Sequence, residues 1–164
     1  MTGFTHESQK SKSIEWYTPE WIFTKLNVKF DVDVCTKKGG INYIPANKYF
    51  CKEDDGLLQE WVGSVWCNPP YGKETSIWLE KFCQHKNGIA LVFARTDTKW
   101  FHNTVEKADA VLFLKGRVQF VDGDNKTNKT GSTRGSMLIA FGKNNVEALK
   151  NLEGFLVLKG DKHE

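Results

Sequence analysis

The chain has 164 residues, of which 40% are hydrophobic and 26% are charged, and its formal net charge is +3 at pH 7. This length suits one domain with a single sizeable core, and no apolar run approaches the roughly 20 residues that a membrane span needs. The composition therefore excludes an integral membrane protein, and so small a net charge does not by itself indicate a nucleic-acid partner.

The cysteines are widely separated, with no CxxC pair and no histidine at zinc-ligand spacing; they are Cys35, Cys51, Cys67 and Cys83. This pattern signals neither a zinc site nor a short disulfide framework. The first residues also lack the charged and apolar pattern of a signal peptide. We therefore expect reduced cysteines, no metal, no membrane association and a cytoplasmic location.

The chain opens on residues 1–13, which are polar and without periodicity, so we expect a flexible tail there. The domain is expected to span residues 14–158, with a second short tail at 159–164. Within IEWYTPEWIFTKL, proline directly after threonine predicts the start of a first helix. That helix would place Trp21, Ile22 and Leu26 on one face.

A first strand is predicted at residues 29–35, KFDVDVC, where alternation gives way to a buried run, and TKKGG ends it. Residues 41–60 indicate a short strand or irregular segment, followed by a turn at Asp54, Asp55 and Gly56. Residues 65–67 predict a second short strand, which delivers NPPY at its carboxyl end.

The remaining chain alternates helical and strand patterns. Helices are predicted at residues 77–85, 98–107 and 146–152, and strands at 88–94, 110–114, 118–121 and 136–141. This alternation predicts a single-domain α/β fold whose sheet is mainly parallel, has helices on both faces and ends in a hairpin-like pair. Ligands of such sheets bind at the carboxyl ends of the strands. The residues after DVDVC, VWC and LVFA should therefore lie on one rim.

The sequence SVWCNPPYG combines groups suited to one kind of substrate. Asn68 offers a side-chain carbonyl, Pro69 a main-chain carbonyl that no helix consumes, and Tyr71 a flat aromatic face. Two acceptors that bind the N–H bonds of an exocyclic amine favour a pyramidal nitrogen, whose lone pair can attack an electrophilic methyl group. Tyr71 would orient the ring by stacking. The alternative is that the two prolines form a stiff loop connector.

The ordered set WYTPEWIF, FDVDVC, DDGL, WCNPPYG, ARTDTKWFH and GRVQF resembles the bacteriophage and prophage DNA N6-adenine methyltransferases, small Dam-like enzymes that use S-adenosylmethionine. The resemblance covers residues 14–142. It implies a Rossmann-like methyltransferase fold, adenine flipped out of DNA as substrate, and the cytoplasm of a host bacterium as location. NPPY alone is less specific, since a similar tetrapeptide occurs in protein N5-glutamine and some RNA methyltransferases.

Carried over by residue, the resemblance implies a catalytic loop made of Asn68, Pro69, Pro70 and Tyr71. Thr18 and Pro19 match a segment that contacts the methionine end of the cofactor in such enzymes.

The resemblance also places Asp33 and Cys35 where the first strand delivers its cofactor-binding loop, although the Gly-rich signature expected there is absent. Asp55 resembles the acidic position near the adenine or ribose of the cofactor, with Asp54 a near competitor. Phe120 resembles an aromatic residue that packs against the extruded base.

Each of these residues also has a plainer interpretation. Asp33 could be a solvated edge charge, and Asp54 and Asp55 are good turn formers. Thr18 could cap the first helix. Phe120 on an alternating pattern could belong to the core.

Residues 115–134 carry five basic side chains against two acidic ones, a local net charge of +3. The remainder is mostly Asn, Thr, Gly and Ser, which predicts a long polar loop between two strands. Such loops are often functional, so this one is the candidate DNA contact surface, through Arg117, Lys126, Lys129 and Arg134. A solvated hairpin is the alternative. No separate target-recognition domain fits in the chain, so sequence specificity should be short unless a second subunit contributes.

The leading hypothesis is transfer of a methyl group from S-adenosylmethionine to the N6 amino group of adenine in DNA. A second hypothesis keeps the fold and the cofactor but has RNA or a protein glutamine as substrate. A third is an inert DNA-binding module, which the missing Gly-rich signature keeps open. The oligomeric state, the recognition site and the role in restriction or gene regulation stay open.

Overall fold

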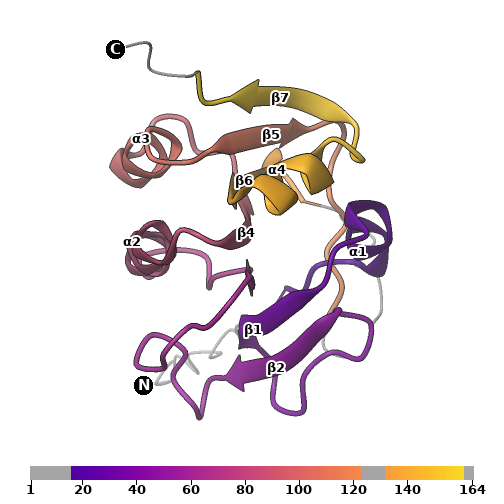
Figure 1. Ribbon diagram of the computed structural model, residues 1–164, viewed down its shortest axis with the longest axis vertical. Helices are drawn as coiled ribbons and strands as arrows, with labels where there is room; N and C mark the ends of the chain where they lie inside the picture. Colours follow the sequence, from indigo (N-terminus) through magenta and orange to yellow (C-terminus); the bar gives the residue numbers. More distant parts are fainter. Residues whose placement is uncertain (1–15, 123–131, 161–164) are drawn as a thin grey trace, which may run out of the picture.

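The computed structural model describes residues 16–122 and 132–160. These residues form one mixed seven-stranded sheet with helices packed on it (Figure 1). In chain order the elements are α1 (Glu20–Leu26), β1 (Phe30–Thr36), β2 (Ala46–Cys51), β3 (Val65–Cys67), α2 (Thr75–His85), β4 (Gly88–Phe93), α3 (Lys99–Val105), β5 (Ala110–Leu114), β6 (Ser136–Phe141), α4 (Lys143–Leu149) and β7 (Gly154–Leu158).

The sheet has the strand order β2-β1-β3-β4-β6-β5-β7 and two halves of different character. The pairs β1–β2, β1–β3 and β3–β4 are parallel, whereas β4–β6, β5–β6 and β5–β7 are antiparallel. The expectation of a mainly parallel sheet is therefore wrong for the second half. The reason is that the hairpin-like pair, β5 and β6, inserts its second strand beside β4, and an additional strand, β7, then pairs antiparallel with β5.

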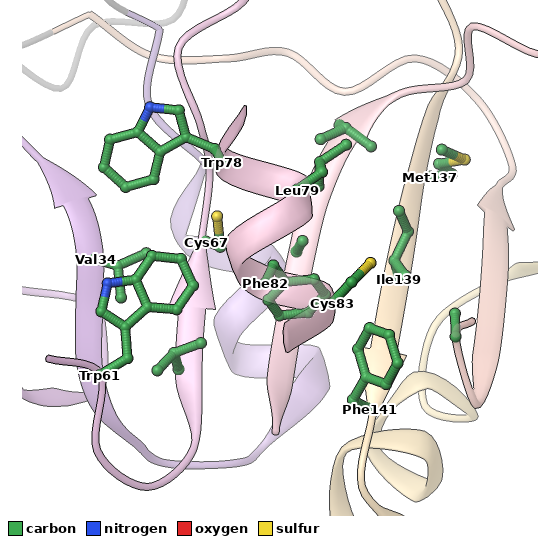
Figure 2. Packing of buried hydrophobic residues seen from close by; sticks show 14 of the residues in the cluster. Val34, Trp61, Cys67, Trp78, Leu79, Phe82, Cys83, Met137, Ile139 and Phe141 are labelled. Carbon is green, nitrogen blue, oxygen red and sulfur yellow. The ribbon is translucent and has the colours of Figure 1, made fainter. Parts of the chain in front are cut away.

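Helices cover both faces of the sheet, as expected. α2 and α3 lie on one face and α1 and α4 on the other (Figure 1). On the first face Trp78, Leu79 and Phe82 of α2 pack over the strands, toward Val34 and Ile139 (Figure 2). This burial of large apolar side chains is the main stabilising contribution to the fold.

The opposite face has its own core, in which Phe23 of α1 meets Trp66 of β3 with ring centroids 4.7 Å apart. Ile22, Phe23 and Leu26 form the buried stripe of α1, whereas Trp21 is 45% exposed. The expected helix face was therefore wrong at Trp21. The i, i+1, i+4 spacing of the buried residues turns the tryptophan outward.

Residues 118–121 do not form the predicted strand. Val118, Phe120 and Val121 are buried, so the alternation reflects packing, but only Val121 forms a bridge, to Tyr17. The neighbouring strands have no free edge to offer this segment, because β6 lies between β4 and β5, and β5 lies between β6 and β7.

The last helix begins earlier than its apolar pattern predicts. It spans Lys143–Leu149 rather than 146–152, because the chain leaves β6 through Gly142, whose φ of 93° suits glycine, and enters the helix directly. The short strand β7 that follows was not predicted. Within the part of the chain that the structure describes, no helix has the length and apolar character needed to cross a membrane.

Candidate functional site

The carboxyl ends of β1, β3 and β4 meet on one rim, because these three strands are adjacent and parallel. β3 delivers Asn68 and the two prolines to this rim, β1 delivers the residues around Asp33, and β4 ends at Phe93. The structure therefore confirms that the segments after DVDVC, VWC and LVFA lie together.

The NPPY loop is held from both ends. Pro70 accepts a hydrogen bond at its carbonyl from the Thr75 hydroxyl (2.8 Å), which ties the loop to the first turn of α2. Asn68 is 9% exposed, and its Nδ2 donates to the Trp16 carbonyl (3.2 Å). The carbonyl of Pro69 makes no hydrogen bond within the described residues. The loop thus holds one free main-chain acceptor beside an amide whose orientation is set by Trp16.

Tyr71 links that amide to an aromatic cluster. Its hydroxyl donates to Asn68 Oδ1 (3.2 Å), which leaves this oxygen capacity for one more hydrogen bond. Its ring stacks on Phe93 with centroids 4.2 Å and planes 20° apart, and meets Phe120 edge to face at 5.9 Å. Burial, with a smaller contribution from Cys67, raises the pKa of Tyr71 far above its usual range, so the hydroxyl remains a donor at physiological pH.

Phe120 has the core position that its alternating pattern allows, and its packing against an extruded base stays a prediction. It is 4% exposed and belongs to the core on the α1 side, and it also touches the rings of Tyr71 and Phe93. Sequence reasoning missed Phe93, which is the last residue of a continuous apolar strand and gives no signal there that distinguishes it from core.

Residues 16–19, here called the crossing segment, join three separate parts of the rim. Trp16 accepts the bond from Asn68, and Tyr17 pairs with Val121 through two backbone hydrogen bonds of 2.9 and 3.0 Å. The Thr18 carbonyl accepts the Tyr43 hydroxyl at 2.7 Å. The structure thus brings Thr18 to the candidate site. Trp16 and Tyr43 were missed, since their roles depend on partners 52 and 25 residues away in the chain.

Thr18 does not cap the helix that follows it. α1 begins at Glu20 with Pro19 as its N-cap residue and has no side-chain cap bond. Thr18 is 1% exposed, and its hydroxyl has no hydrogen-bond partner among the described residues. A buried hydroxyl without a partner costs on the order of 1–3 kcal/mol. The capping interpretation is therefore wrong, and the hydroxyl is free for a ligand.

Asp33 is buried, at 2% exposed, so its interpretation as a solvated edge charge is wrong. Its register with Trp66 directs it to the face of the sheet that carries α1. Oδ1 accepts the N–H of Cys35 at 3.3 Å, and no salt bridge to it occurs in the described part of the chain. Burial is the largest cause that raises the pKa of Asp33, to about 7, against the opposing bond from Cys35. A cationic ligand group is the partner that this carboxylate lacks.

Asp54 and Asp55 act as turn formers in the structure. Asp54 Oδ2 accepts the backbone N–H and the thiol of Cys51 at 2.8 and 3.0 Å, and Asp55 Oδ1 accepts the N–H of Leu57 at 3.2 Å. The next residue, Gly56, lies so close to β1 that a Cβ would clash with the Val34 carbonyl. The turn thus sits beside the end of β1, while a direct cofactor contact of the exposed Asp55 stays a prediction.

Lys81 of α2 anchors this turn. Its Nζ donates to the carbonyls of Leu57 and Gln59, at 2.7 and 2.5 Å, and lies 5.0 Å from the centre of the Trp61 ring. Burial lowers the pKa of this lysine. Sequence reasoning missed Lys81, because a single lysine on a helix normally belongs to the solvated face.

A cleft of about 580 Å³ opens at the carboxyl end of β1. The loop after the strand lines it on one side, and its lining includes Lys37, Gly39, Gly40, Tyr43, Tyr49 and Asp122. Gly40 has a φ of 70°, and a Cβ there would meet the Tyr49 ring, so the loop depends on glycine at this point. The TKKGG loop thus forms one wall of a cleft of the size that small-molecule sites have.

Comparison with known protein families decides the family. The sequence profile described as DNA N-6-adenine-methyltransferase (Dam) matches residues 5–153. The chain belongs to the Dam family. No curated protein and no solved structure matches the chain.

Membership of the Dam family implies DNA N6-adenine methyltransferase activity in general and DNA as the substrate. The mixed α/β fold is compatible with a methyltransferase-like fold. Among the residues that the structure describes, no cluster of three or more His, Cys, Asp or Glu side chains could hold a metal ion. The family match therefore agrees with the resemblance that the ordered motifs predict.

Of the four predicted DNA-contacting residues of this Dam-family chain, Arg134 lies at the aromatic cluster, and Arg117 lies near the residue that follows Arg134. The Arg134 guanidinium lies 5.8 Å from the centre of the Phe93 ring, and Arg117 Nη1 lies close to Gly135. Gly135 in turn accepts the N–H of Ala94, at the carboxyl end of β4. Lys126 and Lys129 lie outside the described residues.

Proposed function

We propose that the chain transfers a methyl group from S-adenosylmethionine to N6 of an adenine flipped out of DNA, with the base held at the NPPY loop. The observation that carries this proposal is the pair of acceptors at the rim. Asn68 Oδ1 keeps capacity for a further bond, and the Pro69 carbonyl is uncommitted within the described residues. Both are held on a loop whose ends are tied to Trp16 and Thr75.

These acceptors match the two N–H bonds of the adenine amino group. When both bonds are engaged, the nitrogen lone pair is directed away from the ring and becomes nucleophilic. Bound S-adenosylmethionine supplies the electrophilic methyl group. The nitrogen loses a proton once it is alkylated, so Asn68 needs only to orient the amine and stabilise its developing charge. No general base is required at the loop.

The aromatic cluster is the proposed wall against which the base stacks. The Tyr71 ring lies directly beside Asn68, to which its hydroxyl bonds, and it packs against the rings of Phe93 and Phe120. An extruded base needs stacking to replace the stacking lost in the duplex. The bond from the Tyr71 hydroxyl to Asn68 fixes the position of that ring relative to the acceptor.

The crossing segment and β1 offer groups that fit the methionine end of S-adenosylmethionine, which carries an ammonium and a carboxylate. Asp33 is a buried carboxylate without a cationic partner in the described chain, and Thr18 is a buried hydroxyl without any partner there. We propose that Asp33 binds the ammonium and that Thr18 donates to the carboxylate.

Replacing Thr18 by valine should separate stability from cofactor binding. The valine removes a buried, unpartnered hydroxyl at nearly constant volume, so the free energy of unfolding of the ligand-free protein should rise by about 1 kcal/mol. Affinity for S-adenosylmethionine should fall by about five- to tenfold, because one hydrogen bond is lost. Thermal unfolding and calorimetric titration measure the two quantities. Unchanged affinity would remove Thr18 from the cofactor site.

Arg134 should contribute to DNA affinity through a phosphate, given its position over Phe93 at the mouth of the proposed base site. Replacing it by alanine should weaken binding to DNA of any sequence and reduce the slope of log affinity against log salt by about 1. Lys143→Ala is the matched control, because it removes one positive charge from an exposed position near the start of β4, at the opposite end of that strand from Phe93. It should leave the slope unchanged. Equal slopes for all three proteins would place the DNA elsewhere.

The proposed reaction is tested by incubating the wild-type protein with labelled S-adenosylmethionine and unmethylated DNA, then resolving the nucleosides of the product. Label in N6-methyladenine is the expected result. Saturable cofactor binding with no transfer to DNA would favour RNA or a protein glutamine as substrate. Absence of cofactor binding would favour an inert DNA-binding module.

A further inference from the structure

β7, the outermost strand of the sheet, has one edge that no other strand of the described residues pairs with. Only β5 pairs with it among the residues that the structure describes, and its other edge lies at the boundary of the molecule (Figure 1). The register with β5 runs from Gly154 to Leu158 without a bulge. Phe155, Val157 and Leu158 are 72%, 41% and 52% exposed. This is an apolar edge of the kind that proteins normally protect, because it invites pairing with another strand.

The opposite edge of the same sheet shows such protection. β2 has Lys48 in its middle, exposed, and its pairing with β1 contains a register shift. A charged side chain and an irregular ladder both disfavour addition of another strand. β7 has neither feature between Gly154 and Leu158. The β2 edge is therefore protected against pairing with a further strand, whereas the β7 edge is not.

The backbone groups on the free edge can be assigned from the bonds on the other edge. The Glu153 carbonyl accepts the N–H of Lys115 at 3.0 Å, and the N–H of Lys159 donates to Asp109 at 2.9 Å. Since backbone groups alternate along a strand, odd-numbered residues face β5. Gly154, Leu156 and Leu158 therefore direct their N–H and C=O groups away from the sheet.

We propose that two copies of the chain associate by antiparallel pairing of their β7 strands, about a two-fold axis through Leu156. Leu156 then exchanges both backbone hydrogen bonds with Leu156 of the second copy, and Gly154 does so with Leu158 of the second copy. Every outward N–H and C=O of the strand is paired. The interaction is isologous, so it closes after two copies.

Side chains support this register. Phe155 lies opposite Val157 of the second copy, an aromatic and β-branched pair that stabilises antiparallel strands. Glu153, directly before the strand, lies opposite Lys159 of the second copy, directly after it. Both residues are exposed and of opposite charge. The β7 edge is therefore complementary to the β7 edge of a second copy, which favours a second copy over an unrelated partner.

The two-fold axis reverses the strand direction from one copy to the other. The rims that carry Asn68 therefore face opposite ends of the joined sheet, and neither copy completes the rim of the other. An edge contact of one short strand is at the small end of interface sizes, so dissociation in the micromolar range is expected.

Sedimentation velocity of the full chain between about 2 and 200 µM tests the pairing. The expected result is a reversible equilibrium between monomer and dimer. Leu158→Pro should abolish the dimer, because it removes an outward N–H and places a ring against the second copy, while the ladder with β5 is unaffected. Wild-type protein that stays monomeric throughout would overturn the proposal.

A charge exchange tests the register itself. Lys159→Glu places like charges opposite each other at both ends of the paired strands and should weaken dimerisation by about tenfold. Glu153→Lys combined with Lys159→Glu restores opposite charges and should recover the wild-type constant. Lys38→Glu, an equal charge change at an exposed lysine far from β7, is the control. A dimer indifferent to Lys159→Glu, or not recovered in the double variant, would overturn the β7 pairing.

Discussion

Asn68→Ala should reduce methyl transfer to DNA by about a hundredfold or more, with the loss in kcat rather than in cofactor affinity. The reason is that the alanine removes the side-chain acceptor beside the free Pro69 carbonyl, and also the bond to Trp16 that orients it. Because Asn68 is only 9% exposed and bonds to Trp16 and Tyr71, its loss should also lower the free energy of unfolding, by about 1 kcal/mol. Steady-state rates with resolved product nucleosides, and a melting curve, check both expectations.

Two further variants sharpen the result for Asn68. Asn68→Asp keeps acceptor oxygens but loses the donor to Trp16, so it should retain intermediate activity. Asn87→Ala is the matched control, since Asn87 also uses its side-chain oxygen as an acceptor, from Asn145 at 3.1 Å, but at the amino-terminal end of the sheet. It should leave the methylation rate unchanged. Near-normal transfer by a folded Asn68→Ala protein would refute the assignment of the NPPY loop as catalytic.

Asp33→Asn should weaken S-adenosylmethionine binding by about ten- to hundredfold, since the asparagine cannot compensate the charge of the ammonium. The same change should stabilise the ligand-free protein at neutral pH, because it removes a buried carboxylate that has no cationic partner in the described chain. Asp31→Asn is the control, since Asp31 lies on the same strand but is exposed and accepts the N–H of Ser64. Calorimetric titration and thermal unfolding measure the two effects.

The contribution of Asp33 to the stability of the ligand-free protein should decrease as pH rises. The pKa of Asp33 is raised from 3.8 to about 7 in the folded protein, so the folded state holds a proton that the unfolded state releases. Protonated Asp33 therefore contributes fully to the free energy of unfolding below about pH 4, and this contribution is lost as pH rises through about 7. The contribution that is lost is at most on the order of 4 kcal/mol.

Bound cofactor reverses that preference, because an ammonium favours the ionised carboxylate. Affinity of the wild-type protein should therefore fall as pH decreases below about 7, relative to Asp33→Asn, in which this titration is absent. Because the cofactor titrates identically in both experiments, the difference between the two proteins isolates Asp33. Parallel pH profiles for the two proteins would contradict an ionised Asp33 in the complex.

The sequence alone determined the elements with strong local signals and the position of the NPPY loop. The short apolar run Val65–Cys67 predicts a buried strand, which the structure confirms. The two prolines after Asn68 end this strand, because they cannot donate to its hydrogen-bond ladder. Adjacent parallel strands then bring NPPY, DVDVC and LVFA to one rim. The apolar runs of β4, β5 and β6 were predicted for the same reason, because burial on both faces leaves a continuous signal.

Only the tertiary structure decided which polar groups have partners. Nothing local distinguishes a capping Thr18 from an orphaned one, or a solvated Asp33 from a buried one, since both outcomes depend on residues distant in the chain. The same holds for residues 118–121, which do not form the predicted strand although their alternating pattern reflects burial, because both edges of β4, β5 and β6 are already paired. Local sequence sets where the chain can turn and what it can bury. Which strand edges, hydrogen-bonding groups and charges become paired depends on contacts between segments that are distant in the chain, so local sequence does not determine it.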